Sequence, residues 1–258
     1  MCEQITDKNV SSLVEKHDTF IFDCDGVLWN WPHVIPGAVD LLNKLTALGK
    51  QIFFVTNNST KTQDDYAKRF ADIGFNAAKK ADQVPSDLQA IKTDEVQLDS
   101  DITCVISALD LHMSYLKVLK AATHLKRKEV LFLGTNDDAS LPTNDEVVMP
   151  GAGAVLAAVT AASGRLPTIL GKPHTPMWKV IQDEFNLNPT KTVMVGDRLE
   201  TDIAFGNNQG LTTILVLTGA TNESHVNELK EQKTDKSNIP NFYISGVGKL
   251  AQLINDSK

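Results

Sequence analysis

The stretch Phe20-Ile21-Phe22-Asp23-Cys24-Asp25-Gly26-Val27 decides how the rest of the chain is interpreted. Its first three residues are apolar without polar alternation, which predicts a short strand buried on both faces, as in a parallel sheet. Asp23 and Asp25 follow at once with i, i+2 spacing, so their side chains point the same way if the strand continues. Gly26 then turns the chain. Both carboxylates are therefore expected at the carboxyl end of a strand, where α/β folds bind ligands.

Two crowded carboxylates repel one another, and such a pair is stable only with a cation or with a shared proton. The alternative is a pair of solvated turn or capping aspartates, and this stretch alone does not choose between the two. Cys24, which lies between Asp23 and Asp25, is expected to point the opposite way and to pack beneath them.

Apolar runs of the same kind recur along the chain, separated by helical patterns. After Pro36-Gly37, leucines recur at helical spacing until Gly49 ends the pattern. Thr175-Pro176 has the form of a helix N-cap followed by proline at the first helical position. The further apolar runs are residues 52–55, 130–133, 193–195 and 214–217. Strands alternating with helices predict an α/β fold with a parallel sheet and right-handed crossovers.

A polar, weakly periodic region at residues 78–101 interrupts this pattern. It separates the N-terminal strands and helices from a middle segment with apolar runs at 103–107 and 130–133 and a Gly/Ala-rich helical stretch at 150–164. This organisation predicts a second domain inserted into the first.

Composition narrows the class of protein. The 258 residues are 42% hydrophobic and 22% charged, which is ordinary for a soluble enzyme. The chain has 25 Lys and Arg against 32 Asp and Glu, a net charge of −7, and so lacks the basic footprint of a nucleic-acid-binding protein.

Cys2, Cys24 and Cys104 are too few and too widely spaced for a disulfide framework. No apolar run approaches the ~20 residues that span a bilayer, and the first twenty residues contain no signal-peptide core. We expect a cytoplasmic protein without nucleic-acid or membrane partners.

Polar residues follow other predicted strands as well. Thr56, Asn57 and Asn58 come directly after one apolar run and supply hydroxyl, amide and backbone N–H donors for an anion. Lys172, between Gly171 and Pro173, can bring a fixed positive charge to the same edge. Each has an ordinary alternative, a polar capping box for the first group and a solvated lysine for the second.

Asp197 ends another apolar run, and Asp202 follows it near the start of the next helix. Clusters of carboxylate oxygens suit Mg²⁺, which prefers octahedral oxygen ligation. Alternatively, Asp202 is a favourable charge at a helix N-terminus.

Four strand ends thus carry, in chain order, Asp-x-Asp, Thr-Asn, Lys and Gly-Asp-x-x-x-x-Asp, an order that resembles the haloacid dehalogenase superfamily. Within it, the chain is most similar to the branch of 4-nitrophenylphosphatases, phosphoglycolate phosphatases and pyridoxal phosphatases. That resemblance covers nearly the whole chain and rests on Phe22-Asp-Cys-Asp-Gly-Val-Leu-Trp29, Val55-Thr-Asn-Asn-Ser-Thr60, Gly134-Thr-Asn-Asp137, Pro150-Gly-Ala-Gly153, Gly171-Lys-Pro173 and Gly196-Asp-Arg-Leu-Glu-Thr-Asp202.

The resemblance implies a catalytic role for each acidic residue. Asp23 is the nucleophile that takes the phosphoryl group, and Asp25 protonates the leaving oxygen and then activates water. Mg²⁺ is held by the Asp23 carboxylate, the Asp25 backbone carbonyl and Asp197, with Asp202 in support.

The resemblance also implies how phosphate is bound. Thr56, Asn57 and Asn58 contact the phosphate, and Lys172 balances its charge together with that of Asp23.

A Rossmann-like core of residues 1–77 and 172–258, with an α/β cap domain inserted at residues 78–171, is the implied architecture. The cap excludes water from the site, and a homodimer through the cap is implied as well. Relative to the family the cap is shortened, because the stretch between Phe75 and Asp99 lacks about one helix and one strand.

Residues 138–142 resemble the family's specificity loop. Members that prefer pyridoxal phosphate carry His where this chain has Leu141, so the resemblance favours phosphoglycolate-like substrates. A leucine in a loop is also an ordinary packing residue.

We therefore predict a Mg²⁺-dependent phosphatase that hydrolyses small phosphate monoesters, 4-nitrophenyl phosphate among them, through a phosphoaspartate on Asp23. A pyridoxal phosphatase or a phosphomutase of the same superfamily remains open. A catalytically idle binding protein is disfavoured by the presence of Asp23, Asp25 and Asp197. A signalling receiver domain is disfavoured by the length of the chain and by an acidic motif that follows Lys172.

Overall fold

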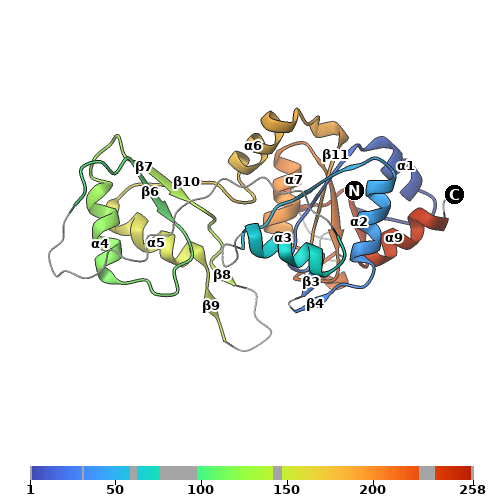
Figure 1. Ribbon diagram of the computed structural model, residues 1–258, viewed down its shortest axis with the longest axis horizontal. Coiled ribbons are helices and arrows are strands. Elements are labelled where there is room, and N and C mark those ends of the chain that lie inside the picture. Colours follow the sequence, from blue (N-terminus) through green and yellow to red (C-terminus); the bar gives the residue numbers. More distant parts are fainter. Residues whose placement is uncertain are drawn as a thin grey trace. The chain divides into compact units, whose positions relative to one another are not determined.

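The computed structural model describes residues 2–30, 32–58, 63–75, 98–141, 147–226 and 236–256. The chain divides into two compact units, drawn in Figure 1. The first unit comprises Met1–Asn57, Arg69–Asn76 and Lys172–Lys258, and the second comprises Asn58–Lys68 and Ala77–Gly171. Most of the stretch in which a helix and a strand are expected to be missing lies outside the described residues.

The first unit is built on a six-stranded sheet in which every neighbouring pair of strands is parallel. In spatial order the strands are β1 (Glu3–Gln4), β13 (Phe242–Ile244), β12 (Thr212–Val216), β11 (Thr192–Gly196), β2 (Thr19–Phe22) and β5 (Gln51–Phe54). This sheet confirms the predicted α/β fold with a parallel sheet.

The two central strands, β2 and β11, account for the position of the candidate site. Every residue of both strands is buried, as their unbroken apolar character predicts. Phe22 pairs with Val195 on one side and with Phe54 on the other, so three strands reach their carboxyl ends at nearly the same level. The residues that follow these strands therefore lie at one edge of the sheet.

Helices cover both faces of this sheet (Figure 1). On one face, Trp178 of α6 and Phe205 of α7 pack with Ile21 and Met194 in a buried apolar cluster. On the other face, α2 contacts α9 and α9 contacts α1. The helices are α1 (Val10–Lys16), α2 (Ala38–Ala47), α6 (Thr175–Phe185), α7 (Ala204–Asn208) and α9 (Val247–Asp256). Of α3 (Gln63–Asp72), the part from Arg69 onward belongs to this unit. Shorter elements are the hairpin of β3 (Trp29–Asn30) with β4 (His33–Val34), the 3₁₀ helices η1 (Pro189–Lys191) and η3 (Lys236–Asn238), and the short π-helix η2 (Leu199–Ile203).

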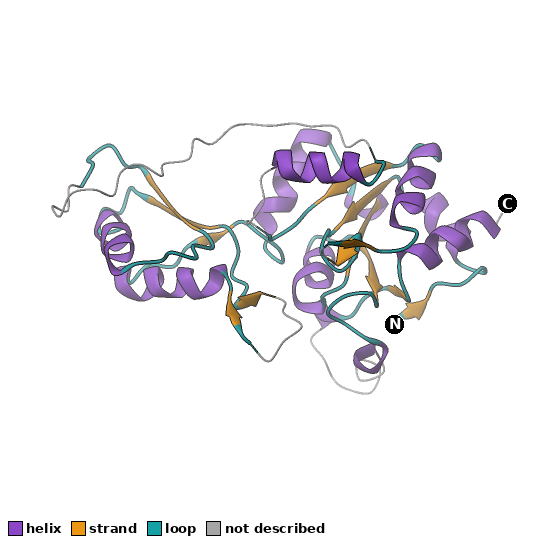
Figure 2. Ribbon diagram, turned by 60° about the horizontal axis from the view of Figure 1, so that its bottom comes forward, coloured by secondary structure: helices purple, strands orange, loops and turns teal. Residues whose placement is uncertain are grey.

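The second unit has its own sheet and its own core. Two helices lie against one face of a three-stranded parallel sheet (Figure 2), and Phe132, Leu156 and Val159 are buried between them. The elements are β6 (Cys104–Ser107), β7 (Leu131–Gly134), β10 (Thr168–Ile169), α4 (Tyr115–His124), α5 (Ala152–Ser163) and the hairpin β8 (Ser140–Leu141) with β9 (Met149–Pro150). The apolar run at residues 130–133 thus forms a strand of this smaller sheet.

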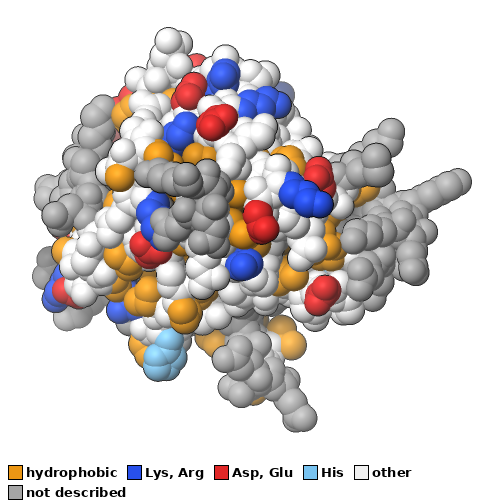
Figure 3. Space-filling view, turned by 90° about the vertical axis from the view of Figure 1, so that its right-hand side faces the viewer, with side chains coloured by type: hydrophobic (Ala, Val, Ile, Leu, Met, Phe, Trp, Pro, Cys, Tyr) orange, Lys and Arg blue, Asp and Glu red, His pale blue; other side chains and the backbone are white. Residues whose placement is uncertain are grey.

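Acidic and basic side chains are interspersed with apolar ones on the face drawn in Figure 3. Within the described part of the chain, no helix combines the length and the apolar character needed to cross a membrane.

Candidate active site

Asp23 lies directly beyond β2 and is buried. Its backbone N–H donates to the carbonyl oxygen of Val195 at 3.0 Å, so the ladder between β2 and β11 continues to this residue. One carboxylate oxygen, Oδ1, accepts a hydrogen bond from Lys172 Nζ at 2.7 Å. The predicted nucleophile is therefore held at its backbone by the sheet and at its side chain by a buried cation.

Lys172 is 2% exposed, and its ammonium group is bonded on several sides. Besides Asp23, it donates to Asp202 Oδ1 at 2.7 Å and to the Val55 carbonyl oxygen at 3.1 Å. Burial alone would lower the pKa of this lysine, but the charges of Asp202 and Asp23 and the hydrogen bonds to them outweigh burial and raise the pKa above its ordinary value. The site thus contains a permanent positive charge.

Asn57 determines where the backbone of Lys172 lies. Its side-chain Nδ2 donates to the Lys172 carbonyl oxygen, and the Lys172 N–H donates to Asn57 Oδ1, both at 3.0 Å. This paired bond joins residues 115 positions apart in the chain. The structure therefore gives the Asn57 side chain a partner that the sequence did not predict. Thr56 and Asn58, its neighbours beyond β5, are half-buried.

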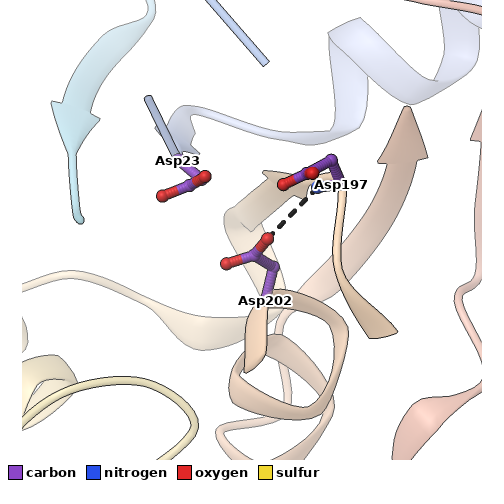
Figure 4. Close-up of side chains that lie close together, drawn as sticks. All are labelled: Asp23, Asp197 and Asp202. Carbon is purple, nitrogen blue, oxygen red and sulfur yellow. Dashed lines mark hydrogen bonds between the residues drawn. The ribbon is translucent and has the colours of Figure 1, made fainter. Parts of the chain in front are cut away.

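Three buried carboxylates converge at this edge of the sheet, those of Asp23, Asp197 and Asp202 (Figure 4). One oxygen from each lies within 4.8 Å of the others. Asp202 Oδ2 accepts the backbone N–H groups of Asp197 and Arg198, each at 3.1 Å, while its Oδ1 accepts from Lys172. Both oxygens of Asp202 are thus engaged by the protein itself.

Asp197 differs from Asp202 in this respect. Its Oδ2 accepts the Ala220 N–H at 2.6 Å, but among the described residues its buried Oδ1 has no hydrogen-bond partner. Burial and the neighbouring charge of Asp202 raise the pKa of Asp197, and burial also raises that of Asp23, although Lys172 opposes the shift. A buried oxygen without a donor, beside two further carboxylates, fits a divalent cation with oxygen ligands such as Mg²⁺.

Asp25 is half-buried, and its Oδ1 accepts a hydrogen bond from the indole Nε1 of Trp29 at 3.1 Å. Gly26 has a φ of +84°, and its N–H donates to the Trp29 carbonyl oxygen at 2.8 Å, so the chain folds back directly after Asp25. Trp29 was not predicted from the sequence as a partner of Asp25. The signal in the sequence was the tryptophan four residues after Asp25, because a tryptophan is usually buried and carries an N–H donor.

The loop after β12 was also missed. The Thr218 hydroxyl donates to the Gly26 carbonyl oxygen at 2.6 Å, and Ala220 donates to Asp197. Between them, Gly219 passes so close to Asp197 that an added Cβ would lie 2.0 Å from Asp197 Oδ2. The Thr-Gly pair directly after an apolar run was the sequence signal for this close approach.

Leu141 lies in the second unit, where it is half-buried in β8 and pairs with Met149 of β9. The preceding segment is tied by a hydrogen bond from Asn136 Nδ2 to Asp138 Oδ2 at 2.7 Å. Pro142, the last residue of the predicted specificity loop, lies outside the described residues. The contact of Leu141 with substrate stays a prediction.

Comparison with known proteins identifies the family. A model described as haloacid dehalogenase-like hydrolase matches residues 20–146, and a second, HAD-hydrolase-like model matches residues 169–242. A 4-nitrophenylphosphatase from Schizosaccharomyces pombe is 32% identical over 95% of this chain and 97% of its own length. A human glycerol-3-phosphate phosphatase is 31% identical, with 96% of this chain and 94% of its own length covered. The crystal structure of a 4-nitrophenylphosphatase from Thermotoga maritima matches with a TM-score of 0.74 and 28% identity, over 93% of this chain and 98% of the other.

This chain belongs to the haloacid dehalogenase-like hydrolases. The predicted resemblance to the 4-nitrophenylphosphatase branch, and the prediction of an enzyme of the phosphatase class, are both confirmed.

The comparison also bears on the length of the chain. The alignment with the human relative runs over 303 positions, 45 more than the 258 residues of this chain, so at least that many positions face gaps here. This chain is therefore shorter than that relative over the aligned region.

Proposed function

We propose that this protein is a Mg²⁺-dependent phosphatase that hydrolyses small phosphate monoesters through an aspartyl phosphate on Asp23. One observation carries the proposal, namely the buried Lys172 ammonium bonded at 2.7 Å to both Asp23 and Asp202. A lysine buried in this way is not a solvated surface residue. Its positive charge lowers the electrostatic free energy of placing a negatively charged phosphoryl group beside these carboxylates.

In the first step, a carboxylate oxygen of Asp23 attacks the phosphorus atom and the ester P–O bond breaks. The electron pair of that bond passes to the leaving oxygen, which takes a proton from Asp25. In the second step, water attacks the same phosphorus atom and gives a proton to Asp25. The bond to Asp23 then breaks, releasing inorganic phosphate. Splitting one displacement into two gives each step a positioned nucleophile and a positioned acid or base.

Asp23, the backbone carbonyl of Asp25 and Asp197 are the groups proposed to hold Mg²⁺, which would supply positive charge to the phosphoryl oxygens when bound. The Oδ1 atom of Asp197, which has no hydrogen-bond partner in the described part of the chain, supports this assignment. Asp202 has both oxygens bonded to Lys172 and to backbone N–H groups, so we assign it to supporting these ligands rather than to direct coordination.

Thr56, Asn57 and Asn58 are proposed to bind the phosphate, because they follow β5 at the same edge of the sheet as Lys172, to which the Asn57 side chain is bonded. We further propose that residues 78–171 act as a cap that excludes water, with Leu141 contacting the organic part of the substrate. The names of the relatives support small phosphate monoesters, and within that class we propose phosphoglycolate-like substrates.

The test is hydrolysis of 4-nitrophenyl phosphate with Mg²⁺ and with excess EDTA, on the unmodified chain and on Asp23→Asn. We expect turnover that requires metal and that falls by at least about 10³-fold in the variant, because the nucleophile is lost. Asp40→Asn is the matched control, since Asp40 pairs with Lys44 on the surface of α2 and should keep full activity.

Two results would contradict the proposal. Turnover that persists in EDTA or in Asp23→Asn would show chemistry that does not use this site. An unmodified chain that binds phosphate but hydrolyses no ester would instead indicate a binding protein.

A further inference from the structure

We propose that Trp29 is a positioning residue for Asp25, whose indole N–H fixes the carboxyl group in the orientation needed to protonate the leaving oxygen. The inference rests on the proposed function, because it assigns a partner to the acid of that reaction. It starts from the 3.1 Å hydrogen bond from Trp29 Nε1 to Asp25 Oδ1.

The turn between the two residues brings their side chains together. Trp29 and Gly26 are joined by a backbone hydrogen bond, and the Cys24 carbonyl oxygen accepts the N–H of Leu28 at 2.9 Å. Trp29 and Asp25 also face one another as an isolated bridge pair. The separation of four residues is thus closed by the backbone, and neither side chain needs to reach far.

Trp29 is itself fixed from outside the turn. Trp29 is only 2% exposed, and the centroid of its ring lies 5.3 Å from the ring centroid of Phe70. The Arg69 guanidinium lies over the indole at 5.7 Å and donates to the Pro32 carbonyl oxygen. Trp29 also pairs with Val34 in the β3–β4 hairpin. An indole held on this many sides offers its N–H in one direction only.

An indole N–H can donate but cannot accept. It therefore engages Oδ1 of Asp25 as a donor and fixes the direction in which the carboxyl group lies. A half-buried aspartate without such a contact would sample several rotamers, and orientation is a substantial part of what a positioned acid contributes. The indole N–H in turn needs an acceptor once buried, so each group fixes the other.

The test compares aryl phosphates of nearly equal shape but different leaving groups. Nitrophenolate leaves readily without a proton, whereas 4-methylphenolate needs the acid. We expect Trp29→Phe, which keeps a ring and removes the N–H, to lower kcat/KM for 4-methylphenyl phosphate at least about tenfold more than for 4-nitrophenyl phosphate. Loss of packing alone would lower both values equally.

Trp178→Phe is the control, because Trp178 is another buried tryptophan of the first unit and lies in a cluster with Met194 and Phe205. It should leave the ratio of the two substrates unchanged. Equal losses for both substrates in a folded Trp29→Phe would overturn the inference while leaving the phosphatase intact. Absence of turnover in the unmodified chain would instead be a failure of the proposed function.

A second variant covers the case in which Trp29→Phe does not fold. Arg69→Ala removes the cation above the indole and its bond to Pro32, but keeps the tryptophan. It should change the substrate ratio in the same direction by a smaller factor. An unchanged ratio in this variant would overturn the inference.

Discussion

Lys172 shows how much of this site depends on a single side chain. Its three acceptors come from three separate parts of the fold, the ends of β2 and β5 and the segment after β11. A buried ammonium group is costly to leave unpaired, and so are the carboxylates that it bonds. Replacing Lys172, or one of the aspartates that it bonds, should therefore destabilise the fold as well as stop the proposed reaction.

Lys172→Met should lower the free energy of unfolding by about 3–5 kcal/mol at pH 8 in EDTA, because it leaves Asp23 and Asp202 as uncompensated buried charges. Without the lysine, the pKa of Asp23, which burial already raises, rises further above its unfolded value. The variant therefore recovers stability as the pH falls and Asp23 becomes neutral. Urea unfolding at pH 8 and pH 5.5 measures both effects.

Lys44→Met is the control for this experiment, since Lys44 pairs with Asp40 near the surface. It should cost roughly 1 kcal/mol or less at either pH. A Lys172→Met variant that loses as much stability at pH 5.5 as at pH 8 would contradict the account.

His17, at the end of α1, makes a second pH-dependent contribution. Its Nδ1 lies 2.7 Å from the Leu13 carbonyl oxygen and its Nε2 lies 2.7 Å from the Thr212 hydroxyl. A carbonyl oxygen can only accept, so Nδ1 carries the proton and Nε2 accepts from Thr212. Burial lowers the pKa of His17 below its ordinary value of 6.5, outweighing the opposing bond to Leu13.

Because the folded state holds His17 neutral, its contribution is present above pH 6.5 and is lost as the pH falls through the lowered pKa. The unmodified chain should therefore lose stability relative to His17→Gln between pH 7 and pH 5. Urea midpoints of both proteins across this range provide the measurement. Curves that stay parallel would show that His17 does not titrate on unfolding.

At the scale of elements, the loop after β12 supports Asp197, the proposed metal ligand. Ala220 donates to the carboxylate of Asp197, and the Thr221 N–H donates to its backbone carbonyl at 3.2 Å. Gly219 permits this approach because it has no Cβ. The loop therefore helps to hold Asp197 in place through these hydrogen bonds and this close approach.

Gly219→Ala should weaken Mg²⁺ binding by at least about tenfold, because the added methyl group would displace the Asp197 carboxylate. Calorimetric titration with Mg²⁺ measures this directly, independently of turnover. Gly210→Ala is a useful comparison, since an added Cβ there meets nothing within 4 Å, although its φ of +73° will cost some stability. Equal Mg²⁺ affinity in Gly219→Ala and the unmodified chain would contradict the proposed support.

The sequence predicted those elements whose signal is local. The central strands β2, β11 and β12 each contain a short apolar run, and all were predicted. The edge strand β1, Glu3–Gln4, has no apolar pattern and was not predicted. It forms because its backbone pairs with β13, a contact about 240 residues away in the chain that no local pattern encodes.

Parallel topology brings the predicted acidic residues together at the scale of the whole molecule. Strand ends of a parallel sheet share one edge, so Asp23 and Asp197 could be expected to meet. The hydrogen-bond partners of the site residues could not be predicted in this way. The bond from Trp29 to Asp25 depends on the shape of one turn, and the paired bond between Asn57 and Lys172 depends on side-chain directions across the fold. Residue type and spacing do not determine either geometry.

Metal binding should also be visible as stability of the entire first unit. At pH 7.5, Mg²⁺ at 100 times its dissociation constant should stabilise the folded state by about 2.7 kcal/mol, and Asp197→Asn should abolish most of this gain. Burial and the charge of Asp202 raise the pKa of Asp197 to about 6, so the gain should shrink below that pH as a proton competes with the metal.

Thermal or urea unfolding with and without Mg²⁺ measures this effect. Asp183→Asn, at an exposed position of α6, is the control and should keep the full gain. A stabilisation that is equal in Asp197→Asn and in the control would place the metal elsewhere.

The central claim is the covalent intermediate on Asp23, and trapping that intermediate tests it most directly. Enzyme turning over 4-nitrophenyl phosphate with Mg²⁺ is quenched in acid and reduced with borohydride, which converts an aspartyl phosphate to homoserine. Peptide mass spectrometry then locates the reduced residue. The account predicts homoserine at position 23, absent without substrate. Reduction at another aspartate, or none at all while turnover is rapid, would contradict it.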